Sequence, residues 1–285
     1  MRIWAFALAA ALSWTTACLA APPIWIARDA DSEVVLFGSI HVLPPELKWR
    51  TPALEAALGR ADDIWFELQV DPQTEQETAR IAAAKGLLPL GQSLFALLPT
   101  HDSKRLIRMA DDLGVDKVAL DRMKPWLAEV ALAGAIYRRD GASSEGGVEA
   151  VVSAAVPAEV RRKAFETPDQ QLSLFDGSTM ADQIASLRET MDEIETQPET
   201  FQDLVRAWST GDIKGLERET AALRRASPDL YRRLVTDRNA AWVKTLAERL
   251  QGHGRTVVIV GVGHLVGRDG VPARLRALGY SVSGP

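Results

Sequence analysis

The sequence predicts an α/β protein with a central, mostly parallel sheet built from both chain termini and a large helical insertion covering the crevice at its edge. Apolar, β-branched runs typical of buried strands lie mainly near the two ends of the chain, and helical apolar periodicity fills the residues between them. A strand–helix–strand order near the start indicates parallel pairing. We therefore expect one domain over residues 21–285, with a helical subdomain at about 73–250.

The first two strands are expected to form a hairpin. Residues 24–27 are apolar, as are 34–37 within a second segment that begins at Glu33, and the turn-rich Asp-Ala-Asp-Ser sequence of 29–32 separates the two segments. Two such runs around a short polar break are typical of an antiparallel pair.

A βαβ unit follows this hairpin. Thr51 and Pro52 are a typical helix start, with threonine as the cap and proline at the first helical position, for a helix that runs to about residue 60. The apolar run 64–68 is the next strand. Because a helix separates them, we expect the strands at 34–37 and 64–68 to be parallel neighbours.

The remaining elements follow from periodicity and from helix-start and turn signals. Residues 73 to about 139 read as helical, and 141–147 as a flexible glycine- and serine-rich loop. Beyond that loop the pattern predicts a helix at 148–155, a weak strand at 163–166, a helix from 167, three or four amphipathic helices over 179–251, a strand at 256–260, a helix at 271–278 and a last strand at 280–282.

Composition narrows the function classes. The formal net charge is −5, which argues against a nucleic-acid partner and leaves no polybasic patch for anionic lipid. Cys18 is the only cysteine. Once the N-terminal segment is removed, the chain therefore has no cysteine nucleophile, thiolate metal site or disulfide.

Residues 1–20 have the character of a signal peptide. One positive charge precedes a short apolar stretch, and small residues lead up to Ala20, where we expect cleavage. The stretch is too short to span a bilayer, and no transmembrane segment is expected elsewhere. The protein is thus expected to be exported, to the periplasm or the exterior. A lipid anchor on Cys18 is the alternative, although Thr15 fits that signal poorly.

Two histidines occur in matching settings at opposite ends of the chain. Gly38–His41 and Gly261–His264 are both Gly-x-x-His sequences that directly follow a predicted strand. Ligands of open α/β sheets bind beyond the carboxyl ends of the strands, and glycine lets the chain turn sharply there. A single histidine in this position is usually structural, but the repeated setting favours a functional pair. The other two histidines, His101 and His253, are expected to face solvent.

Glu67 is the third candidate. It lies in the apolar strand 64–68, where a buried carboxylate needs a partner, although an edge strand facing solvent would also explain it. Together with His41 and His264 it would form a facial set for a divalent ion such as zinc, manganese, cobalt or iron. Such an ion lowers the pKa of bound water and polarises a carbonyl, which is the minimum needed for hydrolysis.

These residues resemble the TraB/PrgY/GumN/TIKI superfamily, most closely its exported bacterial GumN-like branch. The resemblance rests on Leu36–Pro44, Glu67 in an apolar strand, Arg238 and Asn239 on a late helix, and Gly261–Gly267. The match spans nearly the whole chain beyond residue 20, with the motifs in the family's order. Alone, Arg238 would be interpreted as a solvated arginine.

The resemblance implies that His41, Glu67, Arg238 and His264 are the functional residues. It implies a fold similar to the erythromycin esterase and ChaN-like group, and the animal members resemble metal-dependent proteases. The family's Gly-Leu-Glu-Thr stretch is Ala-Phe-Glu-Thr here, which makes Glu166 a further candidate. The histidines would bind the metal, Glu67 would complete its shell or act as general base, and Arg238 would steady the carboxylate or the developing oxyanion.

The favoured function is a metal-dependent hydrolase, specifically a peptidase, with a peptide or small-molecule substrate. A non-catalytic protein that binds haem or an iron chelate at the same histidines is the alternative. A dinucleotide loop is disfavoured because Gly261, Gly263 and Gly267 do not have the required spacing. The helices of 179–251 are amphipathic enough to pack on this chain or on a second copy, so a homodimer is also compatible with the sequence.

Overall fold

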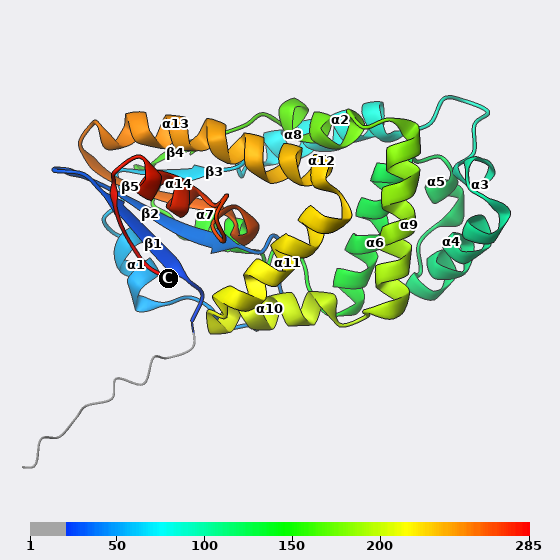
Figure 1. Ribbon diagram of the computed structural model, residues 1–285, viewed down its shortest axis with the longest axis horizontal. Coiled ribbons are helices and arrows are strands. Elements are labelled where there is room, and N and C mark those ends of the chain that lie inside the picture. The colour runs from blue at the N-terminus through cyan, green and yellow to red at the C-terminus, as the bar shows by residue number, and fades with distance from the viewer. Residues whose placement is uncertain (1–20) are drawn as a thin grey trace, which may run out of the picture.

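The computed structural model describes residues 21–285 and has the α/β architecture that the sequence predicts. The predicted signal peptide and its cleavage site after Ala20 lie outside the described residues. One six-stranded sheet, in the order β4-β3-β5-β2-β1-β6, takes strands from both ends of the chain. Most of the helices lie on the side of the sheet to which β2 points (Figure 1).

The sheet is mostly parallel. The strands β2, β3, β4 and β5 form its parallel part, whereas β1 pairs antiparallel with both β2 and β6. The expected hairpin is therefore confirmed as β1 and β2. The strand bounds are β1 Ile24–Arg28, β2 Ser32–Ser39, β3 Asp63–Phe66, β4 Arg161–Ala164, β5 Gly254–Gly261 and β6 Ser281–Ser283.

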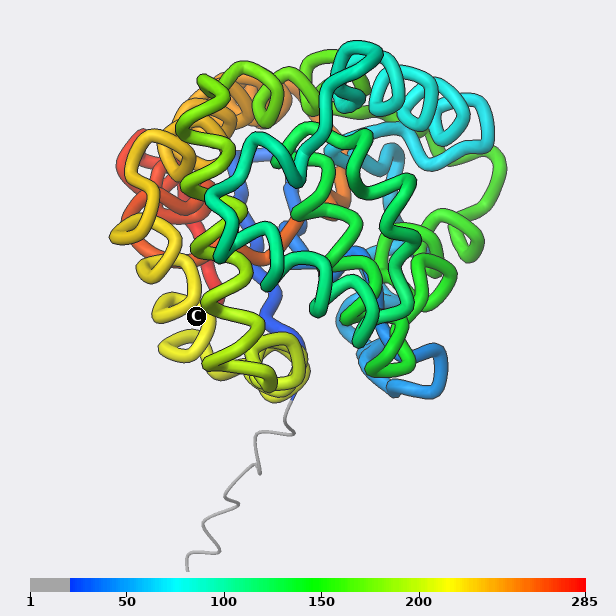
Figure 2. Tube along the Cα trace, turned by 90° about the vertical axis from the view of Figure 1, so that its right-hand side faces the viewer, coloured from blue at the N-terminus to red at the C-terminus, as the bar shows by residue number. Residues whose placement is uncertain are grey.

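The expectation that strands 34–37 and 64–68 are neighbours is wrong. The last long strand, β5, lies between β2 and β3 and pairs in parallel with both. Its run from Val257 to Val260 is buried throughout, and an apolar strand of this kind is most stable in the middle of a sheet covered on both faces. Figure 2 shows the consequence, with the dark blue and orange segments from opposite chain ends lying side by side.

The helices follow the predicted boundaries closely. Thr51 caps α1, and Thr167 forms a capping box with Gln170 at the start of α8. The helical bounds are α1 Pro52–Leu58, α2 Pro72–Gly86, α3 Leu94–Leu97, α4 Thr100–Leu113, α5 Lys117–Asp121, α6 Pro125–Arg139, α7 Val148–Ala155, α8 Pro168–Asp176, α9 Met180–Thr196, α10 Thr200–Thr210, α11 Ile213–Ala226, α12 Pro228–Tyr231, the π-helical turn η1 Arg232–Asp237, α13 Arg238–Leu250, the short 3₁₀ turn η2 Val262–His264 and α14 Val271–Ala277.

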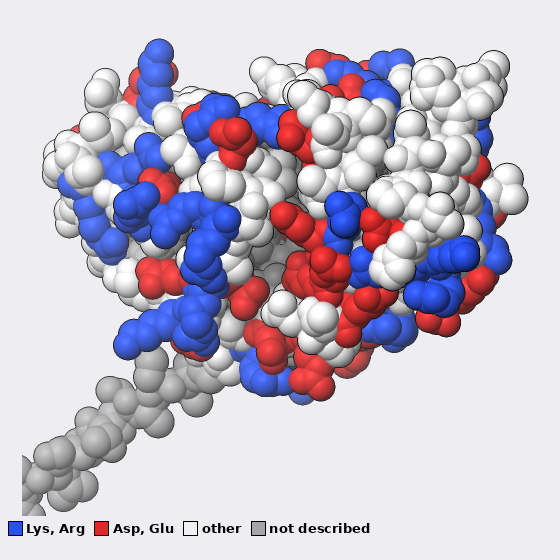
Figure 3. All heavy atoms as spheres, turned by 45° about the vertical axis from the view of Figure 1, so that its right-hand side comes forward, with Lys and Arg blue, Asp and Glu red and all other residues white. Residues whose placement is uncertain are grey.

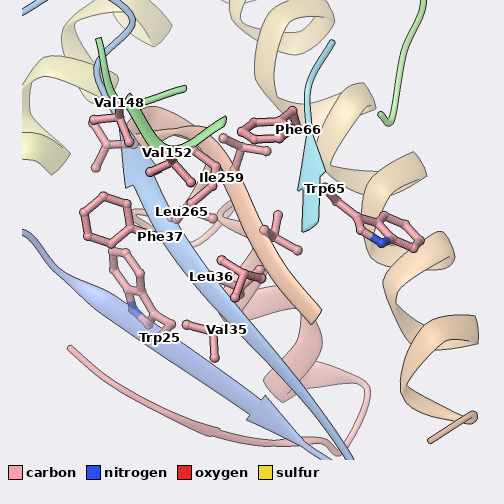
Figure 4. Packing of buried hydrophobic residues seen from close by; sticks show 14 of the residues in the cluster. Trp25, Val35, Leu36, Phe37, Trp65, Phe66, Val148, Val152, Ile259 and Leu265 are labelled. Carbon is pink, nitrogen blue, oxygen red and sulfur yellow. The ribbon is translucent and has the colours of Figure 1, made fainter. Parts of the chain in front are cut away.

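The main hydrophobic core surrounds the sheet. It joins the buried side chains of β2, β3 and β5 to residues of α1, α7, α13 and α14. Figure 4 shows Phe37 and Leu36 on β2 beside Ile259 on β5, with Val148 and Val152 of α7 close by. This packing holds the carboxyl ends of the strands in a fixed relation to α7 and α13, which carry several of the site residues described below.

A second, smaller core lies among the helices. It consists of buried residues from α3 to α6 and from α9, such as Leu106, Leu132 and Leu187. By contrast, α10 and α13 contribute Trp208 and Trp242 to the core of the sheet. Within residues 21–285, no helix is both long enough and apolar enough to cross a membrane.

Candidate functional site

Three side chains meet beyond the carboxyl ends of the parallel strands. His41 follows β2, Glu67 directly follows β3, and His264 ends the short turn η2 after β5. A Cβ placed on Gly261 would lie 3.2 Å from Glu67 Oε1, 3.8 Å from His41 Nε2 and 3.7 Å from His264 Cδ2. The two imidazoles from opposite chain termini therefore lie well within a nanometre of each other, with the carboxylate beside them.

The first glycine of each Gly-x-x-His motif allows neighbouring segments to approach the backbone closely. Neither Gly38 nor Gly261 has a positive φ, so the expected sharp turn is not what requires glycine. A Cβ on Gly38 would lie only 2.7 Å from the side chain of Val262, and one on Gly261 would intrude between Glu67 and His41. Glycine at these positions lets η2 pack on β2 and keeps the centre of the site open.

The protonation of His264 is set by its neighbours. The Asn239 amide donates from Nδ2 to the His264 and Asp269 carbonyls, so its Oδ1 is the acceptor for His264 Nδ1, 2.7 Å away. Nδ1 therefore carries the proton and Nε2 the lone pair. That lone pair accepts a hydrogen bond from Arg238 Nη1 at 3.0 Å. Burial and the charges of Arg238 and His41 lower the pKa of His264 to about 4, so the ring is neutral at pH 7.

Glu67 is held by three donors. Gly261 N–H donates to Oε1 at 2.8 Å, while Arg238 Nη2 and Gln171 Nε2 donate to Oε2 at 2.6 and 3.1 Å. Only 8% of the side chain is exposed. Burial raises the pKa of this carboxyl, but the surrounding histidines and Arg238 outweigh burial and lower it to about 2. Glu67 is therefore an ionised carboxylate with hydrogen bonds to both oxygens, and Oε1 accepts only one of them.

Arg238 joins Glu67 to Glu166. Its Nε and Nη2 donate to Glu166 at 2.7 and 2.9 Å, and Trp242 Nε1 donates to the same carboxylate. The Arg238 guanidinium also lies over the Trp242 ring, 4.7 Å from its centroid. The helix is locally widened into the π-helical turn 232–237 just before Arg238, a distortion that occurs often at functional sites.

His41 differs from His264 in its exposure, because 64% of its side chain is accessible. Its Nδ1 lies 2.7 Å from Glu149 Oε1, which also accepts from Ser39 Oγ at 2.5 Å. The Glu149 carboxylate raises the pKa of His41 to about 10. With Nδ1 held by Glu149, Nε2 is the ring nitrogen left for a ligand.

The structure thus brings together the four residues singled out by the sequence, His41, Glu67, Arg238 and His264, and it places the further candidate Glu166 on Arg238. The Ser39 hydroxyl, within the first of the two motifs, contacts the site through its hydrogen bond to Glu149. The two remaining histidines, His101 and His253, are exposed, as expected.

The sequence gives no indication of Glu149 or Gln171 at the site, and it places Asn239 in a motif without indicating its contact with His264. Glu149 stands in the first turn of α7, where an acidic residue is normally explained by the helix dipole. Gln171 lies on α8, and Asn239 follows Arg238 on α13. The Gly146-Gly147 pair, directly before α7, is the one feature of the nearby sequence that indicates close packing at this position. A Cβ on Gly147 would lie 2.0 Å from the His41 carbonyl oxygen, so this loop runs directly against the first motif.

The imidazole nitrogens and the carboxylate oxygens of the site are donors that suit a divalent ion, but the positively charged Arg238 guanidinium contacts two of the same residues. Over residues 21–285, no three His, Asp or Glu side chains are arranged as a ready-made metal site. The closest His–Glu approach within the set is 3.8 Å, between His264 Nε2 and Glu67 Oε1, and the Arg238 guanidinium bonds to both residues. The ionised Glu67 and the neutral His264 are in the states that metal ligation requires, whereas His41, with its raised pKa, would have to lose its Nε2 proton when an ion binds.

Comparison with known proteins agrees with this architecture. The model of the TraB/PrgY/gumN family matches residues 23–284. The chain is also similar to an uncharacterized protein of Treponema pallidum (strain Nichols), with 25% identity over 263 residues that cover 87% of this chain and 78% of the relative. No solved structure matches the chain.

Proposed function

We propose that this chain, which belongs to the TraB/PrgY/gumN family, is a metal-dependent hydrolase acting on peptides. The observation that carries the proposal is the convergence of two imidazoles and an ionised carboxylate around Gly261. Each imidazole has its Nδ1 held by an oxygen acceptor, Glu149 for His41 and Asn239 for His264. This arrangement fixes the tautomer of the neutral His264, and it directs Nε2 of both rings towards a metal, to which His41 would bind after losing its Nε2 proton.

In this proposal His41, His264 and Glu67 hold the ion. When bound, it supplies a water of lowered pKa and polarises the carbonyl that is attacked. For an ion to bind His264 Nε2, Arg238 would have to leave that nitrogen, while its bonds to Glu166 would continue to neutralise the buried carboxylates. The low pKa of Glu67 favours a role as ligand, since a general base works best with a pKa near the working pH.

A cleavage assay tests this function. Protein spanning residues 21–285 is stripped with a chelator and incubated with a peptide library and added manganese, cobalt, zinc or ferrous iron. We expect cleavage that appears with one of these ions and is lost in Glu67→Gln, which keeps the side-chain shape but removes the charge. Absence of cleavage with every ion would count against a peptidase, and cleavage that persists in Glu67→Gln would come from a contaminant.

The same preparation tests the alternative function, binding of haem or an iron chelate, which stays a prediction. A Soret band that appears when haem is added and disappears in His41→Ala would favour it over hydrolysis. The exposure of His41 makes this residue accessible to either ligand.

We also propose that the protein is exported, because its first twenty residues read as a signal peptide. The mature N-terminus is expected at Ala21. N-terminal sequencing of protein recovered from the periplasm or medium checks this, and a chain that retains Met1 or remains in the cytoplasm would contradict it.

A further inference from the structure

An open groove leads away from the candidate site. It has a volume of about 840 Å³, and His41, Glu67 and Glu149 line one part of it. The rest runs along the first turns of α2 and along α7, with an apolar wall that includes Leu68, Val70, Ala79, Ala82, Ala150 and Ala154. This size and mixture of apolar wall with a few polar groups are typical of ligand sites.

The charge of the groove has a single sign. Five acidic residues line it, whereas no lysine or arginine does. Glu67 is compensated by Arg238, and Glu149 by His41. Among residues 21–285, no basic side chain forms an ion pair with the other three carboxylates, Asp71, Glu75 and Glu145, whereas other surface carboxylates such as Glu33, Glu55 and Glu77 do pair with arginines. Across the wider face that Figure 3 shows, basic side chains lie beside acidic ones.

A second observation concerns Glu149, one of the residues that line the groove. Glu149 Oε2 is buried and, among the described residues, has no hydrogen-bond partner, although Oε1 of the same carboxylate has two. A buried carboxylate oxygen without a donor is costly, so a donor is expected there when the groove is occupied. Water, a ligand N–H or an ammonium group would satisfy it.

We propose that this groove binds peptide segments that carry lysine or arginine side chains, with Glu75 and Glu145 as the carboxylates that select them. The inference rests on the proposed function, because it names the substrate class of that site. The peptide backbone and small side chains lie against the apolar wall, while the cationic side chains pair with the unpaired carboxylates. Both carboxylates are exposed, so the preference is electrostatic and weakens with salt.

The test is a binding measurement that needs neither metal nor turnover. Three labelled hexapeptides with blocked ends, identical except for two central lysines, glutamines or glutamates, are titrated into metal-free protein of residues 21–285 and followed by fluorescence anisotropy. We expect the lysine peptide to bind about fivefold more tightly than the glutamine peptide, and the glutamate peptide to bind most weakly. The lysine preference should vanish at about 0.5 M salt.

The double variant Glu75→Gln/Glu145→Gln is expected to lose the lysine preference while its affinity for the glutamine peptide stays unchanged. Glu217→Gln/Glu248→Gln removes the same charge from exposed helix positions outside the groove and should keep the preference. Equal affinities for all three peptides, or a preference that survives in Glu75→Gln/Glu145→Gln, would overturn the inference. A lysine preference in a protein that neither binds metal nor cleaves peptides would leave the groove assignment standing and remove only the hydrolase.

Discussion

Arg238→Met is expected to lower the free energy of unfolding by about 3–5 kcal/mol, because it leaves two buried carboxylates without their cation. Arg238 is only 10% exposed and makes three of its hydrogen bonds to Glu67 and Glu166, which are 8% and 11% exposed. Methionine fills much of the space but offers no donor. Urea denaturation of residues 21–285, followed by far-UV circular dichroism, measures the loss.

Two comparisons make this prediction specific. Arg232→Met, six residues earlier, removes an arginine that is about half exposed and should cost less than about 1 kcal/mol. Adding Glu67→Gln and Glu166→Gln to Arg238→Met should recover much of the stability, since the uncompensated charges are then gone. If the free energy of unfolding of Arg238→Met is within about 1 kcal/mol of the wild-type value, the buried charge network is not what holds α13 against the strand ends.

Glu149→Gln is expected to return the pKa of His41 from about 10 towards the 6.5 of an unperturbed imidazole. The carboxylate raises the pKa by stabilising the imidazolium, whereas an amide oxygen still accepts from Ser39 and Nδ1–H but carries no charge. The ion pair therefore stabilises the fold fully below pH 6.5, and its contribution is lost as the pH rises through the folded-state value. Titration of the histidine ring protons by NMR in metal-free protein measures the shift.

Ser39→Ala is the matched control, because it removes a hydrogen bond from the same carboxylate and leaves its charge; His41 should then keep a raised pKa. Glu149→Ala removes the acceptor as well, so peptide cleavage at saturating metal is expected to fall about 10–100-fold, with Glu149→Gln closer to the wild type. A His41 pKa that is the same in wild type and Glu149→Gln would show that this pair does not set the state of the ring.

Local signals predicted most of the fold. Thr51-Pro52 and Thr167-Pro168 marked real helix starts, since capping is decided by neighbouring residues. The order of the strands depends on contacts between distant segments. The βαβ rule correctly gave the parallel direction of 34–37 and 64–68, but no residue near either strand indicates that a third strand from the other end of the chain separates them.

The residues of the candidate site also divide into those that a local sequence feature indicates and those that depend on contacts between distant segments. His41, Glu67, Arg238 and His264 could be found because each belongs to a motif or stands out as a charge in apolar surroundings. Glu149 and Gln171 contact partners that are 108 and 104 residues away in the sequence, and Asn239 contacts His264, which is 25 residues away. Their residue types have ordinary explanations on helices, so only the packed structure reveals them.

The most direct test of the central claim is the position of a bound ion. A crystal of residues 21–285 grown with manganese or cobalt, and measured at the absorption edge of that metal, is expected to show one strong anomalous peak bonded to His41 Nε2, Glu67 and His264 Nε2, with Arg238 withdrawn from His264. If crystals grown under the same conditions show no peak at these residues, and Arg238 still donates to His264 Nε2, metal binding at this site is contradicted.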